Sequence, residues 1–568
     1  MLDAAAMRAA AFLDRLPETR RPAPWLVALC LLLWLPGFFT IPAGDRDEAR
    51  FAQASRQMVE SGDYVRIRLG EVERNKKPAG IHWAQAGVVH ALEAVGVPAR
   101  GQIWAYRLPS LLGALVAVLA TCLLGRALVG RRAAFVAAAM LAPCMVLLVE
   151  THIAKTDAAL LATITIAMGL FGRAYLTPEA FSPRQAAAFW AVLGLGVLLK
   201  GPIAPMVPLL AGITLAVMDR PARARFWRLS APWLPALRMG WGLPLMVLCA
   251  APWFVAIGIA TEGRFFAEAI GGDMLDKVGS GEEAHWGPPG MYAAIFGITA
   301  FPSAWIVLRS LPGSWADRMQ APVRFLLAWA VPTWLLFEAV ATKLPHYTLP
   351  AFPALMLLGA RWAMDPLRQA PPRWMRWVGN VALGGVAMGL PVLAGIAAFT
   401  VERRIEGFAL LGLAAGVFMT WALLRMARAQ EWGRAALAGA ILAVPVYASV
   451  LEGVIPRLQA VWLSPRLAAQ VAAVAPGLPA ERFGVVGHHE PSLQFAMGGG
   501  IRLLRDGAAA AEFLAGGEGR IVAVNDRQEA AFRRAAAERG LGLRELGTVA
   551  GLNYVRGRQV ALSLFKVE

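Results

Sequence analysis

Charged residues are scarce in this chain of 568 residues. Asp, Glu, Lys and Arg together make up 16% of it, whereas about 25% is usual for a soluble domain. Hydrophobic residues reach 58%, above the roughly 45–50% of soluble proteins. This composition excludes a disordered protein and an ordinary soluble enzyme. It predicts a membrane protein that crosses the bilayer many times and carries a modest soluble part.

Cysteines are also few, and the familiar nucleotide and hydrolase motifs are missing. The four cysteines all lie inside apolar runs without metal-ligand spacing (Cys30, Cys122, Cys144 and Cys249). We therefore expect each cysteine to be a small, buried apolar residue, and a small domain held together by disulfide bonds is excluded. We find no Walker motif, no nucleophile elbow, no GxGxxG after a predicted strand and no internal repeat.

Long hydrophobic runs fill most of the chain, and about 20 apolar residues suffice to cross a bilayer. Thirteen candidate spans can be read: 24–41, 104–125, 133–150, 157–172, 185–199, 202–218, 240–260, 290–308, 325–341, 347–363, 377–399, 406–424 and 435–454.

Loop charge predicts the orientation of these spans. With residues 1–23 in the cytoplasm, the inside loops hold most of the Lys and Arg, and the short outside loops hold few. This is the positive-inside pattern, and it puts the C-terminus outside. It also explains the formal net charge of +17 without any nucleic-acid partner.

The first outside loop, about 44–103, breaks this pattern because it is long and strongly basic. It is either a solvated loop with scattered ion pairs or an outside-facing site for an anionic ligand. Helical spacing of apolar residues at 47–60 and 82–97 predicts two helices on the membrane surface. The other large outside loop is about 261–289.

The composition changes after residue 463. Short β-rich runs (RFGVVG, IRLL, GRIVAV and QVALSLFKV) and a helical stretch at 527–539 predict a small α/β domain over 464–568. The transmembrane part is then 24–463, and the α/β domain lies outside.

Three segments that this topology places at one membrane face hold unusual polar groups. They are Asp45–Phe51, Asn75–Gly80 and Lys343–Pro350, and Asp157 joins them at the outer start of the fourth span. Carboxylates can act as a base or hold a metal ion or an amine, whereas Lys, Arg and Tyr can hold a phosphate. Ionisable groups at membrane depth are functional candidates.

These segments carry a family resemblance. DEARFAQASRQMVESGD, NKKPAGIHW and KLPHYTLPAFPALMLL occur in this order. With them the chain resembles the protein O-mannosyltransferase-like glycosyltransferases, and more closely the lipid A aminoarabinose transferases and their relatives in glycosyltransferase family 83. The resemblance covers roughly 24–455. It implies the GT-C fold, with about 13 transmembrane helices and periplasmic juxtamembrane helices.

The resemblance implies a reaction and a place. A sugar leaves an undecaprenyl (polyprenyl) phosphate donor and passes, with inversion, to lipid A, lipopolysaccharide or another envelope acceptor. The enzyme lies among the lipids of the bacterial inner membrane, with its N-terminus in the cytoplasm and its active site and C-terminal domain in the periplasm. No nucleotide is needed there.

The resemblance also implies roles for single residues. Asp47 matches the catalytic carboxylate, and Asp157 matches a second acidic position. The expected contacts of the donor phosphate are Arg50, Lys77, Tyr347, Lys343 and Lys277, and the additional candidates are Glu48, Lys76 and His346.

Two departures from the family pattern leave the identity of the transferred sugar undecided. Arg74-Asn75-Lys76 replaces an acidic, aromatic-rich approach, and Asp273-Met274 stands before Lys277 in place of a Glu-His pair. Aminoarabinose, a uronic acid, another pentose and a hexose are all allowed, and a divalent metal ion stays undecided. The alternative functions are a flippase for lipid-linked sugars and a non-catalytic assembly protein.

Overall fold

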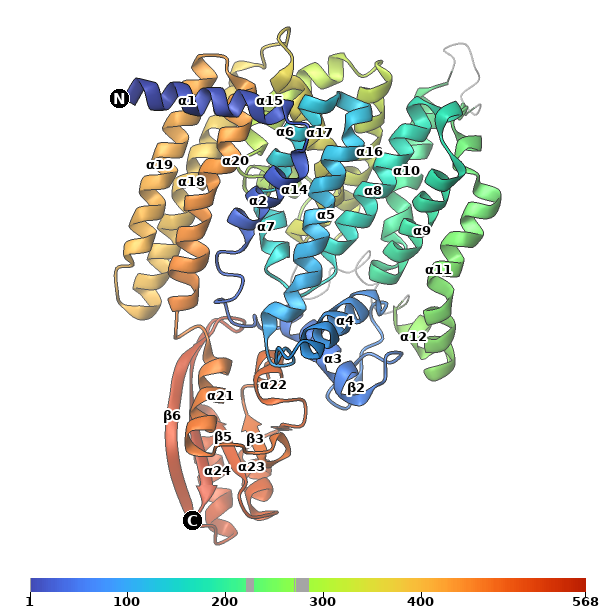
Figure 1. Ribbon diagram of the computed structural model, residues 1–568. Helices are drawn as coiled ribbons and strands as arrows, with labels where there is room; N and C mark the ends of the chain where they lie inside the picture. The colour runs from blue at the N-terminus through green and yellow to red at the C-terminus, as the bar shows by residue number, and fades with distance from the viewer. Residues whose placement is uncertain (1, 221–228, 270, 272–285) are drawn as a thin grey trace.

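The computed structural model describes residues 2–220, 229–269, 271 and 286–568. Figure 1 shows a bundle of helices at one end of the molecule and a small sheet domain at the other. Two helices of the first loop lie between these parts. The N-terminal helix lies at the far end of the bundle from the sheet domain. The predicted contact Lys277 lies outside the described residues.

The bundle is built from apolar helices, which satisfy their own backbone hydrogen bonds in lipid. Its helices are α1 (Leu2–Arg15), α2 (Pro22–Trp34), α5 (Ile103–Val129), α6 (Arg131–Leu141), α7 (Met145–Thr151), α8 (Asp157–Leu176), α9 (Pro183–Lys200), α10 (Ile203–Met218), α11 (Met239–Ala260), α12 (Arg264–Phe266), α14 (Met291–Thr299), α15 (Ala304–Ala316), α16 (Ala321–Ala339), α17 (Phe352–Met364), α18 (Arg373–Glu402), α19 (Gly407–Arg428) and α20 (Trp432–Ala448). A 3-10 turn, η6 (Pro345–Ala351), precedes α17.

The long apolar helices of the structure do not correspond one for one to the thirteen spans predicted from the sequence. Within the described residues, six helices are long and apolar enough to cross a membrane, and α6 with α7, bent by 64°, can form a seventh. The predicted span 290–308 is divided into α14 and α15, and α2 has 13 residues, about 20 Å at 1.5 Å per residue. The multi-pass fold is confirmed, while the count of thirteen stays a prediction.

The two helices predicted for the first loop are present as α3 (Asp47–Ser61) and α4 (Gly80–Ala94). The predicted apolar face of α3, which carries Phe51, Ala54, Met58 and Val59, is buried. A short hairpin, β1 (Arg68–Leu69) with β2 (Val72–Glu73), connects the two helices. Both helices lie across the end of the bundle, above the sheet domain in Figure 1.

The C-terminal domain has a five-stranded sheet in the order β4-β3-β5-β7-β6. Its strands are β3 (Phe483–Val486), β4 (Arg502–Leu504), β5 (Ile521–Asn525), β6 (Leu543–Asn553) and β7 (Arg558–Val567), and its helices are α21 (Leu463–Val474), α22 (Pro491–Met497), α23 (Gly507–Ala515) and α24 (Asp526–Glu538). β3 is parallel to both β4 and β5, and the β6–β7 hairpin closes the other edge. The sequence predicts the other four strands but misses β6, whose glycines and charged residues hide the strand pattern.

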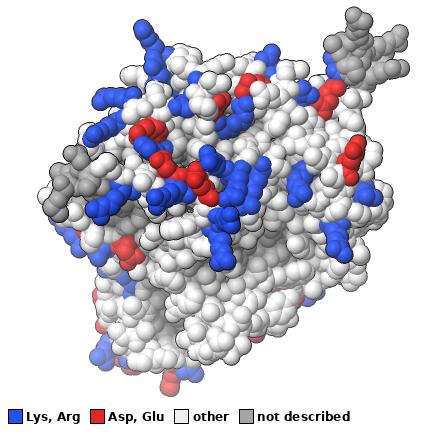
Figure 2. Space-filling model, turned by 45° about the horizontal axis from the view of Figure 1, so that its top comes forward, with Lys and Arg blue, Asp and Glu red and all other residues white. Residues whose placement is uncertain are grey.

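Basic side chains gather at the end of the bundle that carries α1. Figure 2 shows this end, where Lys and Arg greatly outnumber Asp and Glu. Arg131 and Arg132 are exposed there and contact the chain just after α1. The opposite end of the bundle carries α3, α4 and the residues described next.

Candidate active site

A buried ion pair fixes the start of α3. Arg107 of α5 donates to both carboxylate oxygens of Glu48, at 2.7 and 3.0 Å, and these side chains are only 1% and 6% exposed. The same carboxylate accepts the backbone N–H groups of Gly44 at 2.8 Å and Ala154 at 3.2 Å. Glu48 therefore ties the first loop to α5 and to the segment before α8, and it is fully occupied by protein groups.

Asp47, the neighbour of Glu48, has the opposite environment. Its side chain is 59% exposed, and its ion pair with Arg50 is a loose one of 3.7 Å. Asp47 is the first residue of α3, where the partial positive charge of the helix end favours a carboxylate. It is thus a carboxylate that a second molecule can reach.

A cluster of buried charges surrounds Asp157, the first residue of α8. Lys200, the last residue of α9, donates to one carboxylate oxygen of Asp157, and Lys155 lies 3.7 Å from the other. Lys155 also pairs with Glu150 of α7 at 2.9 Å. Two acidic and two basic side chains therefore meet at the junction of α7, α8 and α9. Only well-paired charges are tolerated at such burial.

His346 of η6 completes this cluster. Its Nδ1 lies 3.3 Å from Lys155 Nζ and 3.5 Å from Glu150 Oε1, and its Nε2 lies 3.7 Å from Asp157. Burial holds the pKa of His346 well below its ordinary value, although Asp157 raises it. His346 is therefore neutral at pH 7 and adds no third positive charge to the cluster.

The exposed carboxylate and the buried cluster are electrostatically linked. Burial lowers the pKa of Lys155, but Glu150 and Asp157 outweigh this effect and raise it above its ordinary value. Asp47 contributes to that rise, and Lys77 contributes to the lowered pKa of His346. The predicted residues of all three segments thus lie near one another at one end of the bundle.

The second predicted segment lies against α3. Lys77 Nζ and the guanidinium carbon of Arg74 lie 5.6 and 4.9 Å from the centre of the Phe51 ring, a range in which cations are attracted to aromatic faces. Lys76 is exposed. At Gly80 a Cβ would lie 2.6 Å from the carbonyl oxygen of Leu198. Only glycine allows this approach, which brings α4 next to the end of α9 that carries Lys200.

The two candidate phosphate contacts of the third segment, Tyr347 and Lys343, have different surroundings. Tyr347 is half-buried, with Lys200 Nζ 5.5 Å from the centre of its ring, and it lines a small cavity together with Asp157, Lys200 and His346. Lys343 is buried and donates to the carbonyl oxygens of Phe337, Glu338 and Val340, at 3.2, 2.8 and 2.6 Å. Tyr347 thus faces the cluster, whereas Lys343 caps the end of α16.

The sequence analysis missed the buried Arg107, Glu150 and Lys155 and the largely buried Lys200 at this site. Their signal was present, because each interrupts or ends an apolar run, and such residues are functional candidates. Lys155 and Lys200 were counted only as loop charges. Among the described residues, no group of three or more His, Cys, Asp and Glu side chains is arranged to hold a metal ion.

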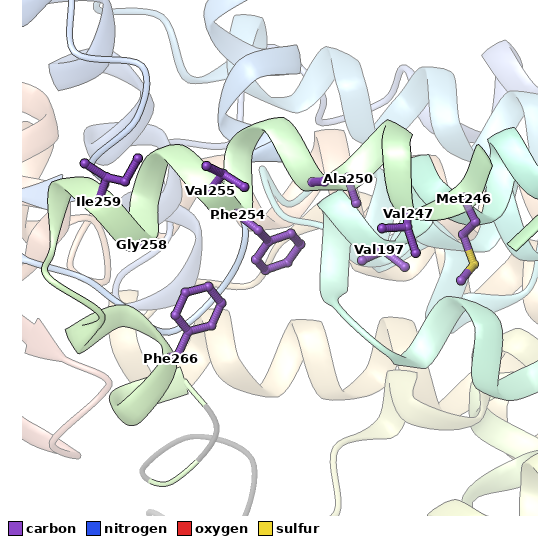
Figure 3. Close-up of a pocket in the computed structure, with 10 residues that line it drawn as sticks. Val197, Met246, Val247, Ala250, Phe254, Val255, Gly258, Ile259 and Phe266 are labelled. Carbon is purple, nitrogen blue, oxygen red and sulfur yellow. The ribbon is translucent and has the colours of Figure 1, made fainter. Parts of the chain in front are cut away.

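An apolar groove runs along α11 beside the site. It has a volume of about 590 Å³ and is lined by one face of α11, by Val197 of α9 and by Phe266. Figure 3 shows Phe254 and Phe266 near each other, where their rings stack at 6.2 Å, and Val197 close to Val247 and Met246 farther along α11. Val197 is one turn of α9 away from Lys200, so this part of the groove wall is close to the charged cluster.

Comparisons with known proteins agree with this geometry. A family model described as dolichyl-phosphate-mannose-protein mannosyltransferase matches residues 77–253. An undecaprenyl phosphate-alpha-4-amino-4-deoxy-L-arabinose arabinosyl transferase of Pectobacterium carotovorum is 27% identical over 68% of this chain and 68% of its own length. The enzyme of the same name from Pectobacterium atrosepticum is 26% identical over 72% of each chain.

A solved structure shows the same fold. The crystal structure of ArnT from Cupriavidus metallidurans bound to undecaprenyl phosphate superposes with a TM-score of 0.72, over 95% of this chain and 97% of that one, at 18% identity. The chain resembles these aminoarabinose transferases in sequence and shares the fold of the solved one. The segment of the chain that the family model matches begins at Lys77 and ends at Trp253, so it includes Asp157, Lys200 and much of α11.

Proposed function

We propose that this transferase moves a sugar from an undecaprenyl-type polyprenyl phosphate to lipid A or another envelope glycolipid, with inversion at the sugar. One observation carries the proposal. An exposed carboxylate, Asp47, acts electrostatically on a buried charge cluster, and the lining of an apolar groove comes within one turn of α9 of that cluster. This arrangement suits a substrate with a long hydrocarbon chain, an anionic head and a reacting sugar.

The chemistry follows from the two environments. An acceptor oxygen attacks the anomeric carbon, and the bond from that carbon to the phosphate oxygen breaks, so that the polyprenyl phosphate leaves with the electron pair. Asp47 takes the proton of an acceptor hydroxyl, whereas an ionised acceptor phosphate needs no base and is only oriented. Lys77, Arg50 and Tyr347 are proposed to stabilise the departing phosphate, with Lys76 at the rim.

Asp157 has a different role in this proposal. It holds Lys200 and Lys155 in place through the buried ion pairs. Lys200 in turn lies beside Tyr347 at the wall of the small cavity. Asp157 thus sets the positive charge that the donor phosphate meets, and His346 acts as a neutral spacer between the two acids.

The groove along α11 is proposed to hold the first isoprene units of the donor. Filling it with Ala251→Trp is expected to raise the KM for the polyprenyl donor about tenfold, because several buried CH₂ groups would lose their contacts at about 0.8 kcal/mol each. Leu248→Trp is the matched control, since Leu248 is 67% exposed on the same helix and does not line the groove. An equal change in KM in both variants would contradict this placement.

The membrane orientation is proposed from charge. The basic end of the bundle with α1 faces the cytoplasm, as the positive-inside rule requires. Asp47, the charge cluster and the C-terminal domain then face the periplasm of a bacterium with an inner membrane. The proposed boundaries of the cytoplasmic segment, the transmembrane part and the domain are those given above, 1–23, 24–463 and 464–568.

The decisive experiment is transfer by the purified full-length protein in liposomes. A panel of undecaprenyl phosphate sugars (aminoarabinose, a uronic acid, another pentose and a hexose) is supplied with lipid A, with and without a divalent metal ion. Products are identified by mass spectrometry. Asp47→Asn is expected to reduce product formation by about 10²–10⁴-fold, and Glu93→Gln, another carboxylate of the same loop, to leave it intact. Movement of the lipid-linked sugar across the bilayer without any transfer would contradict the proposal.

A further inference from the structure

The C-terminal domain touches the chain two residues before Asp47. Ser492, in the first turn of α22, donates a hydrogen bond to the carboxylate of Asp45, and Tyr554, just after β6, accepts the Asp45 backbone N–H at 2.6 Å. Two separate parts of the domain therefore reach the same residue, one through its side chain and one through its backbone.

A chain of hydrogen bonds lies behind Ser492. Ser492 Oγ is 2.6 Å from Ser464 Oγ, which is 2.9 Å from His488 Nε2, and all three side chains are buried. A hydroxyl can donate once and accept as well. The chain is satisfied if His488 donates to Ser464, Ser464 to Ser492 and Ser492 to Asp45. Within the described residues His488 Nδ1 has no hydrogen-bond partner, which fits a neutral ring with its proton on Nε2.

The backbone conformation of Arg46, between Asp45 and Asp47, explains why the contacts of the C-terminal domain with Asp45 are needed. Arg46 has φ of 65° and ψ of −109°, a backbone conformation that residues with a side chain rarely adopt. The side chain of Arg46, the N-cap residue of α3, makes no capping hydrogen bond. A strained residue persists only where its surroundings determine its conformation. On one side Glu48 is held by Arg107 of the bundle, and on the other side Asp45 is held by the C-terminal domain.

We propose that Ser492 and Tyr554 are positioning residues for the transfer reaction. Through Asp45 they fix the turn that presents Asp47, so the C-terminal domain is a working part of the active site. This inference rests on the role proposed above for Asp47. It assigns to the domain a task in catalysis that its placement in the sequence does not reveal.

Docking of the domain and positioning of the turn can be separated experimentally. The domain is also attached to α3 and α5 away from Asp45: Phe495 packs edge-on against Tyr106 at 5.4 Å, and its carbonyl oxygen accepts a hydrogen bond of 2.8 Å from Arg56. These contacts remain when Ser492 and Tyr554 are changed. Tyr554 is 39% exposed, and Tyr554→Phe removes only its hydroxyl and keeps the ring.

The test uses the full-length protein with Ser492→Ala, Tyr554→Phe and the double variant. Thr548→Ala is the matched control, because that hydroxyl bonds Ser563 across β6 and β7 of the same domain. Hydrogen exchange of peptides covering residues 44–48 is measured first, since the Asp45 amide loses its acceptor in Tyr554→Phe. We expect faster exchange of these peptides in both single variants, and unchanged exchange of the peptides around Phe495.

Steady-state transfer is measured next. The double variant is expected to lose about tenfold in kcat, with the KM for the donor within about twofold, because a small displacement of a reacting group is enough for such a loss. In an Asp47→Asn background the same changes should add nothing. Unchanged exchange would overturn the proposed junction, and faster exchange with unchanged kcat would overturn its role in positioning. Full activity of Asp47→Asn would instead contradict the proposed function, while the exchange data would still decide whether the junction exists.

Discussion

The two carboxylates that the sequence singles out, Asp47 and Asp157, lie at the same end of the bundle in opposite surroundings. Asp47 is 59% exposed and has a loose partner, whereas Asp157 is 8% exposed and lies among two lysines and a histidine. An exposed carboxylate can meet an incoming acceptor and exchange a proton with it. A buried and paired carboxylate instead organises the charges around it.

The same contrast separates the lysines. Lys77 is half-buried over Phe51 on the accessible side of the site, and Lys343 is buried against three carbonyl oxygens at the end of α16. The family resemblance favours Lys77 over Lys343 as a phosphate contact, but residue type alone does not distinguish them. The contacts show that the ammonium group of Lys343 stabilises a helix end, and Lys77 is the lysine proposed to meet the donor phosphate.

The largest expected effects contrast the two acids. Asp47→Asn should reduce transfer by about 10²–10⁴-fold, the usual contribution of a general base, without changing thermal stability. Asp157→Asn should also destabilise the fold, by about 3–5 kcal/mol, because it leaves buried lysines without their carboxylate. Activity and thermal unfolding of both variants in detergent test this. Equal stability of the two variants would remove the distinction between them.

A smaller effect should separate the two lysines. Lys77→Met is expected to weaken use of the donor by about 10–100-fold, since a hydrogen bond to a charged group contributes about 1.5–3 kcal/mol. Lys343→Met is expected to lower the melting temperature, because three buried carbonyl groups lose their donor, with a nearly unchanged donor KM. Donor titrations and thermal scans on the same preparations check both. A raised donor KM in Lys343→Met with unaltered stability would instead support Lys343 as a contact of the donor phosphate, as the family resemblance implies.

The sequence predicts this site unevenly, and the reasons are physical. The helical spacing at 47–60 predicts α3 and its buried face, because amphipathic periodicity is a local property. The pairing of Asp157 with Lys200, or of Glu48 with Arg107, depends on how distant helices meet. Such meetings are set by close approaches such as Gly80 against Leu198, and one sequence does not reveal them. The contact between Asp45 and Ser492, 447 residues apart, is the extreme case.

The surroundings of Asp45 are intermediate between those of exposed Asp47 and buried Asp157. Its titration is expected to have the smallest effect, a change in stability with pH. Burial raises the pKa of Asp45 to about 6; the hydrogen bond from Ser492 opposes the rise, the charge of Glu490 adds to it, and Tyr554 and Arg46 oppose it. Because the folded state binds this proton more tightly than the unfolded state, Asp45 contributes stability at low pH that is lost as the pH rises through about 6. Asp45→Asn mimics the protonated form and still accepts the hydrogen bond from Ser492.

His488, at the far end of the same hydrogen-bond chain, titrates with the opposite sign. Burial lowers its pKa to about 4, so its contribution to stability is lost as the pH falls from about 6.5 towards 4. Because the two contributions have opposite signs, they partly cancel in the pH dependence of the wild-type melting temperature. The difference between Asp45→Asn and the wild type isolates Asp45. We expect Asp45→Asn to melt a few degrees higher at pH 7 and to converge with the wild type near pH 4. A constant difference across this range would mean that Asp45 ionises as an ordinary surface carboxylate, and the turn before Asp47 would then lack its buried anchor.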